Sequence, residues 1–378
     1  MLECEIFHNG SLMAIEPTEV YSPRPEPPRR ANLQIAEAPE AATYPQIEDE
    51  LLYNDYVLPG YDSEVDTAGI TSLGSPQHGE HGTTYLEEWP MNDGAGTRYH
   101  ILQCLADNPK SGMWVAKDTA LTTQPTGINL DVAEELMSHG FNVLVKGPEI
   151  GTSLPQSQSA YNTHVVLDTM EQRGRMDAGH IAIEGYSRGA MLAFGTNAYA
   201  EQFGRQVVYS NLTDPCVAKL IKVFDCDGVK KGVTLPLDLL MLGVAVAKGM
   251  ADPTRTKHFI DTVDPSPAGA VQFYRTLKPL LSGEAGMLAA STPEDMHATI
   301  AFFRRCRVND ESMFRRILAN RPGVRFVSPE GGHGAALDKR IIGNIAVRFG
   351  RLGDQLAEGR SPDELDYRDI THGLKPVA

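Results

Sequence analysis

The chain has 378 residues, of which 42% are apolar and 22% charged, and its formal net charge is −15 at pH 7. These proportions are those of a soluble globular protein with a substantial core. The acidic balance argues against nonspecific nucleic-acid binding and against docking on anionic lipid through a basic surface.

The cysteines and the N-terminus bear on the compartment. The five cysteines are odd in number and scattered, which favours a reducing environment. The first ten residues lack the basic and apolar regions of a secretory leader. The longest apolar run, 235–250, is interrupted by Asp238 and is short for a bilayer. We therefore expect a cytoplasmic protein without a transmembrane segment.

Residues 1–95 read as an N-terminal extension. A hairpin is predicted over 3–15, around the Asn9-Gly10 turn. The proline-rich stretch 21–50 should be extended across an outer surface. The best strand candidate is "TTYLEEW" at 83–89, which we expect at a sheet edge.

Strand and helix patterns alternate from Thr97 onward. Such alternation predicts an α/β fold with a doubly wound, mainly parallel sheet and helices on both faces. We assign this core to 96–215 and 296–360. The predicted strands are 98–105, 141–147, 180–185, 206–212, 298–306 and 324–328, and the predicted helices are 129–140 (capped by Asn129), 160–174, 187–204, 311–323 and 341–359.

The alternation is interrupted at 216–295, which reads as helices and loops. We predict that this segment is a helical cap over the carboxyl edge of the sheet. Its apolar stretch 235–249 could line a substrate pocket or form the cap's own core. The polar tail 361–378 is expected to be loosely attached.

The pentapeptide "GYSRG", Gly185 to Gly189, lies between a buried strand and an apolar helix. A tight strand-to-helix turn presents the Ser187 hydroxyl and brings the residues two before and two after it close to their neighbours, so glycine fits both positions. Ser187 at the start of a helix would also lie where the dipole favours an oxyanion.

A nucleophilic serine needs a base and an orienting acid. His333 lies between two glycines in the loop after the last predicted strand, where an imidazole has room to move. Asp310 follows the preceding strand and is the favoured acid. Asp214, after the strand "VVYSNL", is second, and Glu311 is a third candidate that fits a helix start better.

The order Ser187, Asp310, His333 and the elbow resemble the α/β-hydrolase superfamily over some 180 residues. The resemblance implies a serine esterase or lipase-like catalytic triad with an inserted cap. It also implies that backbone N–H groups form the oxyanion hole, the first from Arg188 and the second from near Ala106. Many members show a His-Gly pair after the strand that carries this loop; here residues 105–108 are Leu-Ala-Asp-Asn.

The predicted function is hydrolysis of a small-molecule carboxylic ester with an apolar acyl or alcohol part. No cofactor or metal is expected, because the cluster His78, Glu80 and His81 lacks a helical metal-binding spacing. Thioesterase, peptidase or acyltransferase activity on the same scaffold remains an alternative, as does a catalytically silent binding protein. A homo-oligomer is possible.

Overall fold

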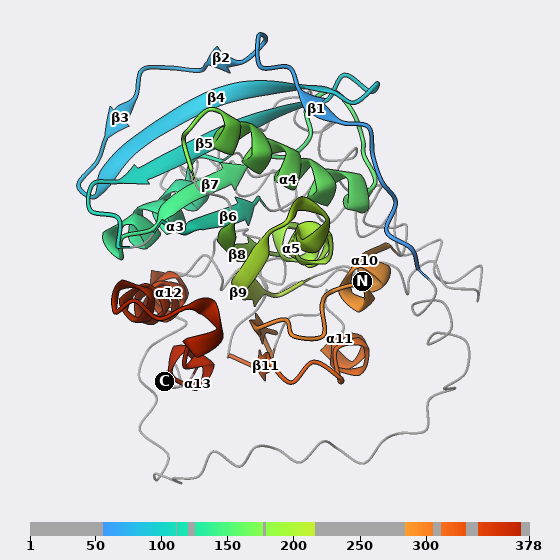
Figure 1. Cartoon of the computed structure of the whole chain (residues 1–378), viewed down its shortest axis with the longest axis vertical. Coiled ribbons are helices and arrows are strands. Elements are labelled where there is room, and N and C mark those ends of the chain that lie inside the picture. The colour runs from blue at the N-terminus through green and yellow to red at the C-terminus, as the bar shows by residue number, and fades with distance from the viewer. Residues whose placement is uncertain are drawn as a thin grey trace, which may run out of the picture.

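The computed structural model in Figure 1 describes residues 56–110, 112–119, 125–176, 179–215, 284–304, 311–329 and 339–371. The predicted hairpin, the proline-rich stretch, Asp310 and His333 lie outside these ranges, as does most of the predicted cap. Within the described ranges, no helix is both long and apolar enough to cross a membrane.

One twisted sheet organises the described residues (Figure 1). Its strands follow the order β1-β4-β5-β7-β6-β8-β9-β10-β11, and β2 and β3 also pair with β4. From β7 to β11 all neighbours are parallel, whereas β5 is antiparallel to both β4 and β7. The strands are β1 (Glu64–Val65), β2 (Thr71–Ser72), β3 (Gln77–His78), β4 (Gly82–Asn92), β5 (Arg98–Ala106), β6 (Trp114–Asp118), β7 (Asn142–Lys146), β8 (His180–Tyr186), β9 (Gln206–Thr213), β10 (Ala298–Ala301) and β11 (Val324–Val327).

Helices cover both faces of the sheet, and each face has its own apolar core. One core joins β8 residues such as Ile181 and Ile183 to the first helical layer, and the other joins Ala182 to the second. This alternation along β8 is what a strand buried on both faces requires. The first layer contains α4 (Gln156–Gln172), α5 (Arg188–Tyr199), α10 (Glu284–Ala290) and α11 (Glu311–Ile317), and the second contains α3 (Ile128–Ser138), α12 (Lys339–Ala357) and α13 (Tyr367–Thr371); the short helices η1 (Ala200–Phe203) and η3 (Pro362–Glu364) complete the set. The predicted fold class is confirmed.

The predicted strand at 83–89 is confirmed as part of β4, next to β5 near one edge of the sheet. Sequence reasoning missed β6, which lies between β7 and β8 in the parallel part of the sheet. Trp114 pairs with Asn142 and Ile181, and at the other end Asp118 pairs with Lys146 and Gly185. The end of β6 therefore lies beside the end of β8, which Ser187 follows.

Three local expectations need correction. Asn129 is buried inside the first turn of α3, and the N-cap position belongs to Gly127. The tail is attached as far as Thr371, because Leu365 and Ile370 are buried in the same core as residues of α12. Helix α10 falls within the predicted cap, yet Leu288 is fully buried in the core that includes α5. The predicted boundary at 295 is therefore too late by at least this helix.

Candidate active site

The corner between β8 and α5 has the geometry that the sequence predicts for a nucleophile elbow. Strand β8 ends at Tyr186, Ser187 is the N-cap residue, and α5 begins at Arg188. Ser187 has φ 58° and ψ −119°, a strained conformation for a residue with a side chain. Its backbone N–H donates a 2.9 Å hydrogen bond to the Thr213 carbonyl oxygen at the end of β9.

The two flanking glycines are required by space. A Cβ atom on Gly189 would lie 2.1 Å from the backbone oxygen of Asp118. A Cβ atom on Gly185 would lie 2.7 Å from the backbone oxygen of Gly189 and 2.8 Å from Cα of Ala190. Any side chain at either position would force the turn apart, so the physical reason given for both glycines is confirmed.

Asp214 lies beside this corner. It follows β9, whose last residue pairs with Tyr186 at the end of β8. Asp214 is fully buried, and with φ 52° it is, apart from Ser187, the only non-glycine residue with positive φ in the described ranges. Its N–H donates to the Ala301 oxygen at 2.7 Å, and its Oδ1 atom accepts a 3.4 Å hydrogen bond from the N–H of Phe303. Two strained residues thus end neighbouring strands at one edge of the sheet.

Glu311, the other acid candidate in the described ranges, has its own hydrogen-bond partners at the start of a helix. It is the first residue of α11, and its Oε1 atom accepts hydrogen bonds from Arg315 at 2.8 Å and from the Ser328 hydroxyl at 3.4 Å. This is the helix-start role expected from the sequence.

Ala106 is a wrong prediction for the second oxyanion donor. It ends β5, which runs antiparallel to β7, and its N–H donates a 2.9 Å hydrogen bond to Oδ1 of Asn142, the first residue of β7. Ser187 instead follows the last residue of β8, which is parallel to β6 and β7. Ala106 and Ser187 therefore lie at opposite edges of the sheet.

The strand end that does adjoin the elbow is that of β6. Asp118 is its last residue, and its backbone oxygen limits the space at Gly189. Thr119 is fully buried, and its N–H donates to the Lys146 carbonyl oxygen at 3.0 Å. Ala106 lies at the opposite edge of the sheet from Ser187. The lack of a His-Gly pair after Ala106 therefore does not bear on an oxyanion hole beside Ser187.

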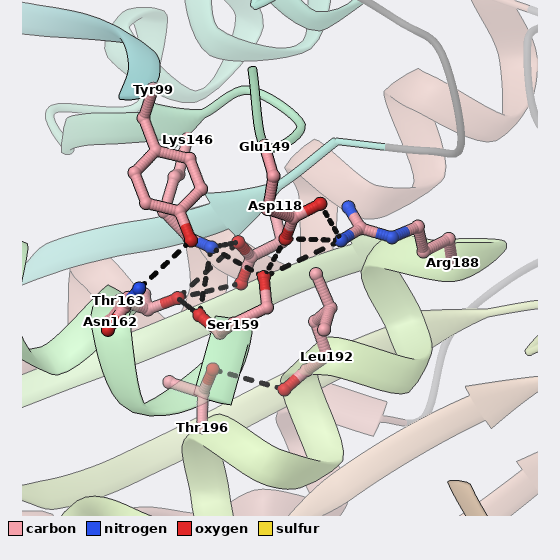
Figure 2. A network of polar contacts seen from close by, with 10 residues as sticks. All are labelled: Tyr99, Asp118, Lys146, Glu149, Ser159, Asn162, Thr163, Arg188, Leu192 and Thr196. Atoms are coloured by element: carbon pink, nitrogen blue, oxygen red, sulfur yellow. Dashed lines mark hydrogen bonds and ion pairs between the residues drawn. The ribbon is translucent and has the colours of Figure 1, made fainter. Parts of the chain in front are cut away.

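A network of buried charges includes Arg188, the first residue of α5 (Figure 2). Nη2 of Arg188 lies 2.6 Å from both carboxylate oxygens of Glu149, and Nζ of Lys146 lies 2.9 Å from Oδ1 of Asp118. Ser159 joins the two pairs: its hydroxyl donates to Glu149, and Lys146 donates to its hydroxyl at 3.2 Å and to its carbonyl oxygen at 3.0 Å. The four charged side chains are at most 4% exposed, and their formal charges cancel.

The pKa of Glu149 reflects this environment. Burial by itself raises the pKa, but the charges of Arg188 and Lys146 and the hydrogen bond from Ser159 outweigh it, so the pKa lies below its usual value. Glu149 is therefore a carboxylate at neutral pH.

The weak cluster near residue 80 shows no sign of a metal centre. Nδ1 of His78 hydrogen-bonds the Thr83 hydroxyl at 2.9 Å. Across the part of the chain that the structure describes, no three His, Cys, Asp or Glu side chains are grouped to hold a metal ion.

Comparison with known proteins gives structural similarity only. No family model and no curated protein sequence matches the chain. Among solved structures, the chain is similar to a hydrolase from Pseudomonas aeruginosa PA01 (12% identity, 75% of this chain and 99% of that one, TM-score 0.46). It is also similar to a bacterial brefeldin A esterase (14%, 82% and 82%, 0.46) and to a carboxyl esterase from Bacillus coagulans (13%, 76% and 99%, 0.47).

The fold is identified from the sheet, its helices and the turn at Ser187. A mainly parallel sheet carries helices on both faces, and a strained serine between two sterically required glycines joins a central strand to its helix. The fold is α/β-hydrolase-like, as the sequence resemblance implied.

Proposed function

We propose that the protein is a serine hydrolase that cleaves a carboxylic ester through an acyl-enzyme on Ser187. The observation that carries the proposal is the strained corner at Ser187, at the N-terminus of α5. The first N–H groups of a helix have no partner within the helix, and they stabilise negative charge. A hydroxyl held there can attack an acyl carbonyl while its neighbour's N–H receives the oxyanion.

In the proposed mechanism, His333 takes the proton from the Ser187 hydroxyl as Oγ attacks the carbonyl carbon. The N–H of Arg188 and a second backbone N–H near the end of β6 bind the tetrahedral oxyanion. The protonated His333 then donates its proton to the departing alcohol. Water, deprotonated by His333, attacks the acyl-enzyme and releases the acid.

The acid that orients His333 is proposed to be Asp310, with Asp214 as the second candidate. A specific observation favours Asp214: it is buried and strained at the end of the strand next to that of Ser187. The variants Asp310→Asn and Asp214→Asn separate the two. The variant that removes the triad acid should lower kcat by several orders of magnitude, on the order of 10⁴-fold, and the other should retain activity once its folding is verified.

Substrate preference is proposed to come from the segment 216–283, whose apolar stretch 235–249 would face an apolar acyl or alcohol part. A panel of p-nitrophenyl esters of increasing acyl length tests this proposal, with a thioester and a peptide substrate in parallel. We expect ester hydrolysis that improves with apolar chain length. Faster turnover of the thioester or the peptide would replace ester hydrolysis as the function.

The role of the nucleophile is tested by Ser187→Ala and His333→Ala, each of which should nearly abolish turnover. Ser210→Ala is a matched control, since Ser210 is buried, as Ser187 is, but hydrogen-bonds Asn197. If the panel shows no turnover by the native chain, or turnover that survives Ser187→Ala, the proposal is wrong.

A further inference from the structure

The four buried charged side chains around Arg188 are costly for the stability of the folded protein. Removing two acids and two bases from water carries a large desolvation penalty, and apolar residues in such places often leave a protein as stable or more so. A contribution to stability therefore does not explain why charged residues occupy positions 118, 146, 149 and 188. Their positions along the backbone suggest a different role.

Two of the charges are fixed to backbone segments next to Ser187, and the other two link them. Arg188 is the first residue of α5 and carries the proposed oxyanion N–H. Asp118 ends β6 and is in close backbone contact with Gly189. Lys146 ends β7, and Glu149 lies in the connection between β7 and α4. The side chains thus join the first residue of the elbow helix to the last residue of β6.

The contacts run without a break from one segment to the other. Arg188 binds Glu149, Glu149 accepts a hydrogen bond from Ser159, Ser159 accepts one from Lys146, and Lys146 binds Asp118. Further contacts hold Lys146 and Asp118 at one end of this chain of contacts. The ammonium group of Lys146 lies 4.6 Å from the ring centroid of the fully buried Tyr99. The Thr163 hydroxyl lies 3.3 Å from Oδ2 of Asp118. Figure 2 shows these side chains joined in one network of polar contacts.

We propose that Glu149 is a positioning residue, which acts with Ser159 and Lys146 to hold Arg188 and Asp118 at a fixed separation. The backbone donors on the two sides of the oxyanion are then preorganised before substrate binds. An oxyanion hole stabilises the transition state only if its N–H groups already point to where charge develops. This inference rests on the proposed function, since it assumes the reaction at Ser187.

Arg188→Lys is the main test. Lysine keeps the positive charge, so Glu149 is not left without a counter-ion, but it loses the planar guanidinium that contacts both carboxylate oxygens. A displacement of about 1 Å at a reacting centre can cost about 100-fold in rate. We expect kcat, and the rate at which a fluorophosphonate modifies Ser187, to fall by about that factor while KM changes little.

Glu149→Gln tests the same chain of contacts from its centre and should give the same split between kcat and KM. Its matched control is Glu184→Gln. Glu184 forms an equally buried ion pair with Lys117, and because Lys117 and Asp118 are consecutive in β6, this pair lies on the opposite face of the sheet. We expect the control to lose thermal stability and to keep its kcat.

The outcomes separate the inference from the function it rests on. Fluorophosphonate that fails to modify Ser187 in the native chain would overturn the proposed function. Normal modification of the native chain, with Arg188→Lys modified at the same rate, would overturn only the positioning role. An equal loss of kcat in Glu184→Gln and Glu149→Gln would also overturn it, since general destabilisation would then account for both.

Discussion

Replacing Gly189 by alanine tests the geometry of the elbow with a single methyl group. The added Cβ would start 2.1 Å from the backbone oxygen of Asp118, whereas ordinary van der Waals contact begins at 3.4 Å. The obstacle is backbone in the central strand β6, and a rotamer change cannot relieve it. The N-terminus of α5 and the end of β6 must therefore separate by about 1.3 Å, the difference between these two distances.

Two effects of this separation can be estimated. Overpacking a buried position costs about 1–3 kcal/mol of the free energy of unfolding, which a domain of ordinary stability survives. A shift of more than 1 Å also moves the N–H of Arg188 away from the developing oxyanion, which costs at least about 100-fold in rate. The loss of activity should therefore greatly exceed what the loss of stability explains.

Gly195→Ala is the control for Gly189→Ala. Its Cβ would also collide, at 2.5 Å from Cβ of Ala160 and 3.3 Å from Cδ1 of Leu288, but these are side-chain atoms of α4 and α10. Gly195 itself lies six residues further along α5 than Gly189. Urea denaturation and the fluorophosphonate rate should be measured on both variants and the native chain. We expect a destabilised control that reacts at the native rate. Gly189→Ala that reacts as fast as the native chain would refute the reasoning.

Two further predictions concern buried groups away from the elbow. Burial lowers the pKa of His164 to about 3, against about 6.5 in an unfolded chain. Below about pH 6, His164 is protonated in the unfolded state but stays neutral in the native state. The free energy of unfolding should therefore fall by about 1.4 kcal/mol for each unit by which the pH is lowered from about 6 to 4. Urea denaturation across this range checks it with His164→Gln as reference, and parallel pH profiles for the two proteins would contradict it. Burial, and secondarily the charge of Glu134, raises the pKa of the Cys104 thiol, so we expect Cys104 to stay unmodified by a thiol reagent in the native protein and to react in urea. Peptide mapping by mass spectrometry reports both states, and rapid native modification of Cys104 would show that its burial is wrong.

The elbow could be predicted because its signal is local. Within 15 residues the apolar pattern changes from a strand to a helix, and two glycines flank one serine at the point of change. The sheet and its two helical layers could be predicted for the same reason, because each strand and each helix has its own apolar periodicity in the sequence. Asp214 was named from its place after β9, but the strained backbone that singles it out is visible only in the structure.

Strand β6 was missed because its burial does not show in its composition. Its last two residues are Lys117 and Asp118, and charged residues at a strand end normally indicate a loop. Both are buried because each has a counter-charge on a neighbouring strand, Glu184 and Lys146 respectively. Such pairing between distant residues leaves no periodic signal. Because β6 was not predicted, the oxyanion donor was assigned to Ala106 at the end of β5, at the opposite edge of the sheet from Ser187.

Mapping the residue that a fluorophosphonate modifies tests the central claim most directly. The native protein is treated with the reagent, digested, and its peptides are sequenced by mass spectrometry, with Ser187→Ala and Ser210→Ala treated alongside. We predict one adduct, on Ser187, present in Ser210→Ala and absent from Ser187→Ala. Adducts that form elsewhere, or that persist in Ser187→Ala, would mean that the strained corner after β8 does not present a nucleophile.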